Sequence, residues 1–153
     1  MVTLTINGKT VTAPEGSTIL QAANASGIAI PYLCYLKDVN EIGACRVCVV
    51  EIEGVDRLAA ACNTPAENGM VVHTNSPRAR KARRTNVQLM LSQHDCNCPT
   101  CARNGNCSLQ SLAMELNVLD VPFKNNIPEN RWDNTAPLIR SESKCIKCIS
   151  SIN

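Results

Sequence analysis

Four cysteines are concentrated in one stretch of the chain, in the pattern Cys34-x10-Cys45-x2-Cys48-x13-Cys62. Cysteine thiolates are ligands for zinc and for iron–sulfur clusters, and a Cys-x2-Cys pair places two sulfurs on one tight loop. Zinc ribbons usually present two close pairs, whereas here one close pair stands between two single cysteines. The spacing therefore favours a [2Fe-2S] cluster, and a structural zinc site is the alternative.

A second group of possible ligands follows in the pattern His94-x3-Cys98-x2-Cys101-x5-Cys107. A histidine just ahead of a Cys-x2-Cys pair and a further cysteine completes a set of four ligands. From these residues alone, zinc and an iron–sulfur cluster are equally well supported. Cys96 lies in the same stretch, but its spacing to Cys98 is too tight for it to replace His94, and we interpret it as a non-ligand.

Both patterns resemble one known family. The stretch around Cys34 to Cys62 resembles the [2Fe-2S] domain that opens the large electron-input subunit of respiratory complex I, of NAD(P)-linked [FeFe]-hydrogenases and of some formate dehydrogenases. The contexts Cys98-Pro-Thr-Cys101 and Gly105-Asn-Cys107 resemble the His(Cys)3-ligated [4Fe-4S] domain that follows it in the same family. The resemblance implies two sets of ligands: Cys34, Cys45, Cys48 and Cys62 for the [2Fe-2S] cluster, and His94, Cys98, Cys101 and Cys107 for the [4Fe-4S] cluster.

A third cysteine pair lies near the end of the sequence, at Cys145 and Cys148. A bacterial ferredoxin motif runs Cys-x2-Cys-x2-Cys-x3-Cys-Pro, and here Ser151 stands where the third cysteine would be. In the family that the chain resembles, a two-cluster [4Fe-4S] domain begins at this point. We interpret residues 144–153 as a truncated start of that domain, and we expect the pair not to hold a normal cluster alone.

The elements that must position the first set of ligands begin with a β-hairpin. Residues 2–6 and 9–13 alternate apolar and polar side chains on either side of Asn7-Gly8, which predicts a type I′ turn. A helix is predicted to follow, with Ser17 as its N-cap and Gly27 at its end. Further strands are predicted at residues 47–53, 58–61 and 70–74.

The predicted fold class is α+β. A hairpin followed by a helix is the start of a β-grasp, which agrees with the β-grasp ferredoxin domain that the resemblance implies, followed by a small helical [4Fe-4S] domain. The proline-rich stretch behind the second domain is interpreted as a linker, in which Trp132 packs on a neighbour. The predicted parts are a β-grasp domain at 1–76, a His(Cys)3 domain at 77–117, a linker at 118–143 and the truncated domain at 144–153.

A helix is also predicted from Pro77 to about residue 92, with Ser76 as its cap. Basic residues are concentrated in the first half of this helix, where they spread around the helix axis instead of sharing one face. We interpret their side chains as solvated, with docking of a partner subunit as the second interpretation. Nucleic-acid binding is the least favoured, because no nucleic-acid motif accompanies the run. The basic residues are Arg78, Arg80, Lys81, Arg83 and Arg84.

The composition limits the other possibilities. Aromatic residues make up 3% of the 153 residues, so the small cores would be marginal without bound metal. The ten cysteines occur without a secretory signal, which favours metal binding in a reducing compartment over disulfides and predicts a cytoplasmic protein. No run of about 18 apolar residues predicts a membrane span. The formal net charge of +2 says little about partners.

Taken with the resemblance, these observations predict an iron–sulfur electron-transfer module. The resemblance implies transfer of single electrons between a flavin- and NAD(P)H-linked subunit and a hydrogenase-type catalytic part that this sequence lacks. It implies other redox subunits as partners and allows a peripheral position on a membrane complex. No complete active site is predicted, because the sequence has neither a Gly-x-Gly-x-x-Gly fingerprint nor a cysteine set for an H-cluster. The alternatives are a zinc-stabilised binding module without redox activity and a non-functional relic.

Overall fold

The computed structural model describes residues 1–129, 141–146 and 148. It divides into two compact units, Met1–Arg83 and Arg84–Cys148, and the division falls inside one helix. The interpretations of Trp132 and Ser151 lie outside the described residues, as does the central part of the predicted linker.

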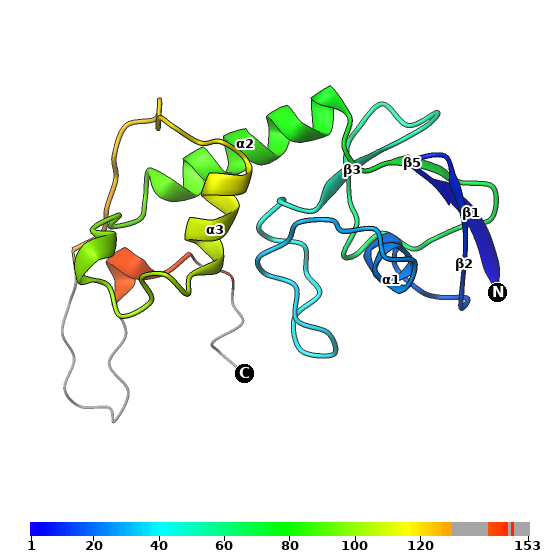
Figure 1. Cartoon of the computed structure of the whole chain (residues 1–153), viewed down its shortest axis with the longest axis horizontal. Helices are drawn as coiled ribbons and strands as arrows, with labels where there is room; N and C mark the ends of the chain where they lie inside the picture. The colour runs from blue at the N-terminus through cyan, green and yellow to red at the C-terminus, as the bar shows by residue number, and fades with distance from the viewer. Residues whose placement is uncertain (130–140, 147, 149–153) are drawn as a thin grey trace. The chain divides into compact units, whose positions relative to one another are not determined.

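The first unit is built on a mixed sheet (Figure 1). From one edge to the other, its strands among the described residues are β2 (Lys9–Ala13), β1 (Val2–Ile6), β5 (Val71–His73), β3 (Val49–Ile52) and β4 (Ala59–Ala60). β1 and β5 run parallel, and the other neighbouring strands are antiparallel. The predicted strands are all present, although β3, β4 and β5 are shorter than expected. A mixed sheet combined with helices confirms the predicted α+β class.

The hairpin turn has the conformation that its sequence predicts. The backbone φ angle is 51° at Asn7 and 80° at Gly8, and a type I′ turn requires positive values at both positions. The register that follows places Leu4 opposite Val11 and thereby brings the apolar positions of the two strands onto one face. That face is buried through Val2, Leu4, Ile6, Val11 and Ala13.

Helix α1 (Ile19–Ala25) begins one residue later than predicted, because its N-cap is Thr18 and not Ser17. The Thr18 hydroxyl accepts a hydrogen bond from the Gln21 N–H (3.3 Å), and the Gln21 side chain accepts one from the Thr18 N–H (3.0 Å). This reciprocal pair is a capping box. Gly27, with a φ of 72°, lies just past the end of the helix, as predicted.

The core of the first unit is formed by α1 and the buried face of the sheet, which lie side by side in Figure 1. Ile19 and Leu20 of α1 are completely buried, and burying such a side chain stabilises a fold by about 1.5–3 kcal/mol. Cys48 and Cys62 belong to the same core and are also completely buried. The core therefore excludes water from two of the predicted ligands.

The second unit is mainly helical among its described residues. It contains the later part of α2 (Pro77–Leu91), together with α3 (Ser108–Glu115) and the short 3-10 helices η1 (Cys98–Thr100) and η2 (Glu142–Lys144). Its buried apolar side chains in the described part of the chain are Val87, Leu109 and Leu112. None of the described helices combines the length and the apolar character needed to cross a membrane.

Helix α2 starts as predicted, since the Ser76 hydroxyl accepts a hydrogen bond from the Ala79 N–H at 3.2 Å. The predicted solvation of the basic run, however, is wrong for Arg83, whose side chain is buried. Its guanidinium donates hydrogen bonds to the carbonyl oxygens of Val49 (2.7 Å) and Thr74 (2.6 Å). The physical reason is its position: Arg83 lies four residues after Ala79 and therefore on the same buried face of the helix.

Candidate metal centres

The first centre is formed by Cys34, Cys45, Cys48 and Cys62, which the fold of the first unit brings together. Three of these cysteines are buried and Cys45 is half-buried. Cys48 directly precedes β3, and Cys62 follows β4, so the antiparallel pairing of these two strands brings both residues to the same end of the sheet. The buried Asn40 side chain donates a hydrogen bond to the Cys34 carbonyl (3.0 Å) and thereby holds the loop between Cys34 and Cys45 in place.

The four thiols fall into two hydrogen-bonded pairs, Cys34 with Cys45 and Cys48 with Cys62. The pKa of Cys34 is raised, chiefly by burial. The hydrogen bond from Cys62 lowers the pKa of Cys48 to about 6, and the same bond raises the pKa of Cys62. The charges of Cys34 and Cys45 also raise the pKa of Cys62, so each pair lies within electrostatic reach of the other.

Backbone N–H groups of the ligand loop point at the Cys34 sulfur. The Cys45 N–H points at the Cys34 sulfur (3.4 Å), and the Ala44 N–H also donates to it. The loop reaches this conformation through positive φ angles of 68° at Gly43 and 52° at Arg46. Such N–H groups stabilise negative charge on sulfur and are one of the features that set the reduction potential of a cluster.

The paired arrangement suits a two-iron cluster better than one zinc ion. A structural zinc site needs four ligands around one ion, whereas each iron of a [2Fe-2S] cluster takes two protein ligands. Two thiol pairs beside one another therefore fit the cluster.

The second centre is less compact in this structure. His94 follows the end of α2, and its buried Nδ1 atom has no hydrogen-bond partner among the described residues. A buried polar atom without a partner costs about 1–3 kcal/mol, which a bound metal would recover. The pKa of His94 is lowered, first by burial and then by the charge of Lys144, so the neutral imidazole that binds metal is favoured.

The three cysteines of this centre lie at the start of η1, directly after it and before α3. Cys98 opens η1 and Cys101 follows it, and the Cys101 N–H donates to the Cys98 carbonyl at 3.0 Å. Cys107 stands at the N-cap position of α3. The charges of Cys98 and Cys101 both act on Lys144, which also acts on His94, so these residues are close in space. No described contact joins the Cys107 thiol to the other three.

Lys144 is a residue near this centre that the cysteine patterns did not indicate. Its ammonium group donates to the carbonyl oxygen of Asp95 (3.1 Å) and forms an ion pair with the Asp95 carboxylate (2.8 Å). The Asp95 N–H in turn donates to the Ser143 carbonyl at 2.7 Å. The signal available in the sequence was the position of Lys144 directly before a Cys-x2-Cys pair, but its partner lies 49 residues away.

Three cysteines lie outside the two proposed sets of ligands. Cys96 is exposed, and its thiol lies 3.4 Å from the His94 carbonyl. Cys145 and Cys148 are half-buried, and Cys145 follows η2. No disulfide joins any cysteines among the described residues.

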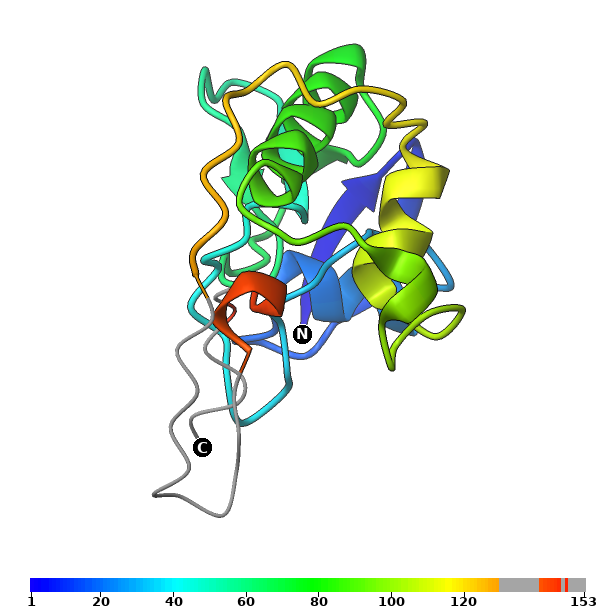
Figure 2. The same cartoon turned by 90° about the vertical axis from the view of Figure 1, so that its left-hand side faces the viewer.

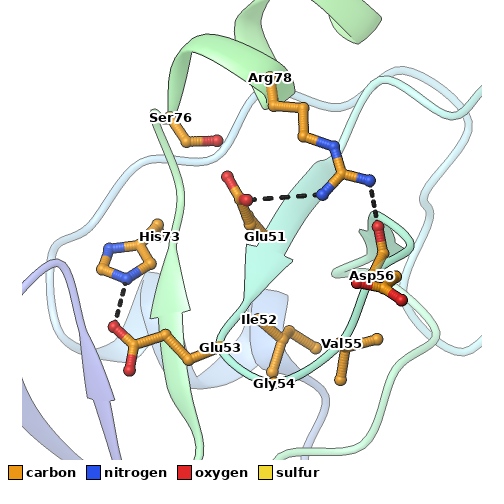
Figure 3. Close-up of a pocket in the computed structure, with 9 residues that line it drawn as sticks. All are labelled: Glu51, Ile52, Glu53, Gly54, Val55, Asp56, His73, Ser76 and Arg78. Atoms are coloured by element: carbon orange, nitrogen blue, oxygen red, sulfur yellow. Dashed lines mark hydrogen bonds and ion pairs between the residues drawn. The ribbon is translucent and has the colours of Figure 1, made fainter.

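A hollow of about 460 Å³ lies in the first unit, away from the cysteines (Figure 3). Two ion pairs cross it. The His73 imidazole lies 2.8 Å from a carboxylate oxygen of Glu53, and the Arg78 guanidinium lies 3.6 Å from a carboxylate oxygen of Glu51. Arg78 also donates to the carbonyl oxygen of Asp56. These contacts link β3 and the turn after it to β5 and the start of α2, and such exposed ion pairs contribute little to stability.

Comparison with known proteins agrees with both centres. Residues 1–77 match the family described as 2Fe-2S iron-sulfur cluster binding domain, and residues 83–122 match the NADH-ubiquinone oxidoreductase-G iron-sulfur binding region. A solved structure titled as NAD+-reducing [NiFe]-hydrogenase in the H2-reduced state superposes with a TM-score of 0.86. It is 33% identical in sequence, and the match covers 97% of this chain and 63% of that chain.

Several curated proteins match nearly the whole chain. The NADP-reducing hydrogenase subunit HndD of Solidesulfovibrio fructosivorans is 47% identical over 97% of this chain and 26% of its own length. The NADPH-Fe(3+) oxidoreductase subunit alpha of Geobacter sulfurreducens is 44% identical over 97% of this chain and 18% of its length. The mitochondrial NADH-ubiquinone oxidoreductase 78 kDa subunit of Candida albicans is 37% identical over 96% of this chain and 21% of its own length. The chain thus spans about a quarter or less of the length of each of these relatives.

The fold, the two thiol pairs and the matches to the two families together define an iron–sulfur protein. It has binding domains for a [2Fe-2S] and a [4Fe-4S] cluster. The chain belongs to the family of 2Fe-2S iron-sulfur cluster binding domains, in the form that NAD(P)-linked hydrogenases and NADH-ubiquinone oxidoreductases share. The resemblance seen in the sequence and both predicted cofactors are confirmed. The alternative of a zinc-stabilised module without redox activity finds no support.

Proposed function

We propose that the chain passes single electrons between a flavin- and NAD(P)H-linked subunit and a hydrogenase-type catalytic part. The observation that carries this proposal is the arrangement of two thiol pairs in the first unit: Cys48 and Cys62 lie in its core, and backbone N–H groups point at the Cys34 sulfur. The names of two relatives support a role in NAD(P)-linked electron transfer, since they describe an NADP-reducing hydrogenase and an NADH-ubiquinone oxidoreductase. Other redox subunits are then the partners, and the cytoplasm is the proposed location.

In the first unit, Cys34 and Cys45 would hold one iron, and Cys48 and Cys62 the other. When bound, the cluster supplies a reversible one-electron carrier, and the redox chemistry belongs to it. The protein contributes position and environment. The core excludes water from Cys48 and Cys62, and the N–H groups directed at Cys34 stabilise its negative charge.

In the second unit, His94, Cys98, Cys101 and Cys107 would hold the [4Fe-4S] cluster. The buried Nδ1 of His94 supports this assignment, because the imidazole is kept neutral in an environment that offers it no other partner among the described residues. A neutral histidine in place of a thiolate lowers the negative charge of a site and tends to raise its reduction potential.

We also infer that the first unit is a β-grasp ferredoxin domain. Its support is the order of elements: a hairpin, then α1, then a strand that returns parallel to β1. The boundaries at 1–76, 77–117, 118–143 and 144–153 stay predictions, as does the inability of Cys145 and Cys148 to hold a normal cluster alone.

The test is metal analysis combined with electron paramagnetic resonance (EPR) on protein purified without oxygen and reduced with dithionite. We expect about six irons per chain, two from a [2Fe-2S] and four from a [4Fe-4S] cluster, and two distinguishable reduced signals. Cys48→Ala should remove one signal and His94→Ala should alter the other. Cys96→Ala, a cysteine outside both sets, is the matched control and should leave both signals unchanged. About two zincs and no iron, in protein produced with ample iron, would contradict the proposal.

A further inference from the structure

The short helix η2, red-orange in Figure 2, lies in the second unit against the start of the second ligand set. Three contacts join the two segments. The Asp95 N–H donates to the Ser143 carbonyl, and the Lys144 ammonium binds both the carbonyl oxygen and the carboxylate of Asp95. The Lys144 and Asp95 side chains are only 28% and 37% exposed, and Ser143 is buried. The backbone bond fixes Lys144 beside Asp95 independently of the ion pair.

The charge of Lys144 reaches the ligands of this centre. The hydrogen bond to Asp95 is the main cause that raises the pKa of Lys144, and the charges of Asp95, Cys101 and Cys98 raise it further. Lys144 lowers the pKa of His94, and the same ion pair lowers the pKa of Asp95. An ammonium group and a carboxylate, 2.8 Å apart, therefore lie in this centre, and Asp95 directly follows the proposed ligand His94 in the chain.

We propose that Lys144 and Asp95 are positioning residues that set the reduction potential of the second cluster in opposite directions. The inference rests on the proposed function, because it takes His94, Cys98 and Cys101 as ligands. Reduction adds one electron and therefore one negative charge to the site, with no bond made or broken. A nearby cation stabilises that charge and raises the potential, whereas a nearby carboxylate lowers it. In the intact protein the two opposite effects on the reduction potential largely cancel. Removing either charge alone should therefore shift the potential more than removing both.

The two substitutions that separate these effects are Lys144→Met and Asp95→Asn, each close in size to the original side chain. The measurement is a dithionite titration of the full iron-loaded chain, followed by EPR, which gives the midpoint potential of the [4Fe-4S] signal. At the wild-type midpoint, Lys144→Met should lower the ratio of reduced to oxidised cluster about threefold and Asp95→Asn should raise it about threefold, as expected for a charge in a half-exposed site. The double variant should return close to the wild-type potential.

Three controls separate an electrostatic role from a structural one. Lys144→Arg keeps the charge and should keep the potential. Glu115→Gln removes an exposed carboxylate at the far end of α3, about 12 Å along the helix from Cys107, and should not move it. The shifts should shrink at high ionic strength, because both groups are in contact with solvent. A structural role would not produce opposite signs or this salt dependence.

These measurements distinguish a failure of the inference about Lys144 and Asp95 from a failure of the proposed function. If the wild-type chain shows no [4Fe-4S] signal, the ligand assignment itself is wrong. If the signal is present but both substitutions leave the potential unchanged, or move it in the same direction, the inference about Lys144 and Asp95 is overturned and the ligands stand. If Lys144→Met does not assemble the cluster, an unchanged potential in Asp95→Asn overturns the inference by itself.

Discussion

Gly43 combines a positive φ angle with a close neighbour, the Asn63 side chain. Its φ of 68° is strained for any other residue, and an added Cβ would lie 2.8 Å from the Asn63 side-chain nitrogen. Asn63 follows Cys62 directly, and its amide lies 3.4 Å from the carbonyl of Ile42 in the first ligand loop. A side chain at this glycine would therefore displace the Asn63 amide and disturb its contact with the Ile42 carbonyl, which joins two segments that flank proposed [2Fe-2S] ligands.

Gly43→Ala should consequently weaken both stability and cluster binding. The positive φ alone costs a non-glycine residue about 1–2 kcal/mol, and the contact with Asn63 adds to it. Gly54→Ala is the matched control, because Gly54 has a φ of 78° but open space around it. Chemical denaturation and the [2Fe-2S] signal per chain measure the two effects. Equal losses in both variants would show that the contact with Asn63 is unimportant.

The residue scale also shows what the sequence could establish about the site. The cysteine spacing identified the four thiols that the structure gathers in the first unit, because a Cys-x2-Cys pair constrains its own local geometry. The burial of Arg83 could have been read from its helical spacing to Ala79, although charge is usually taken to mean exposure. The contact of Lys144 with Asp95 could not be predicted, since no local pattern links positions 49 residues apart.

At the scale of elements, α1 illustrates a local rule that decides between two neighbours. Ser17 and Thr18 are both good N-cap residues, and Ser17 was the predicted cap. Only Thr18 has a glutamine three residues later, Gln21, which completes the reciprocal capping box that the structure shows. The hairpin turn, the glycine after α1 and the Ser76 cap of α2 were predicted correctly because turns and caps depend on adjacent residues. The short lengths of β3, β4 and β5 were not, because strand ends depend on distant pairing.

Thr18→Ala should therefore destabilise the first unit by about 1 kcal/mol, the usual cost of losing an N-cap. Ser17→Ala should change the free energy of unfolding by only a few tenths of a kcal/mol, since the Ser17 hydroxyl takes no part in the capping box. Denaturant unfolding of the iron-loaded chain distinguishes the two. A larger loss for Ser17→Ala than for Thr18→Ala would contradict the assigned cap.

At the scale of the whole molecule, the two units differ in what stabilises them. The first has a continuous apolar core that includes Cys48 and Cys62, whereas the second buries few apolar side chains among its described residues. A small unit with a limited core depends on bound metal for its folding free energy. The scarcity of aromatic residues had predicted that the chain depends on bound metal for its stability. It did not show that the second unit depends on metal more than the first.

Removal of the clusters by an iron chelator under reducing conditions should unfold the second unit more completely than the first. Amide hydrogen exchange measures this directly: protection in α3 should be lost, while part of the protection in β1 and α1 should persist. Reconstitution with iron and sulfide should restore α3. Equal loss of protection in both units would mean that the apolar core of the first unit is not sufficient without its cluster.

Arg83 determines where this chain can be cut. The match to the 2Fe-2S family ends at residue 77, yet the compact first unit continues to Arg83, whose guanidinium binds the carbonyls of Val49 and Thr74. A piece ending at residue 77 would leave these two acceptors without their donor, at about 1–3 kcal/mol for each one that stays buried. A transplantable one-cluster cassette made from this protein should therefore extend past the family boundary by at least the first two turns of α2.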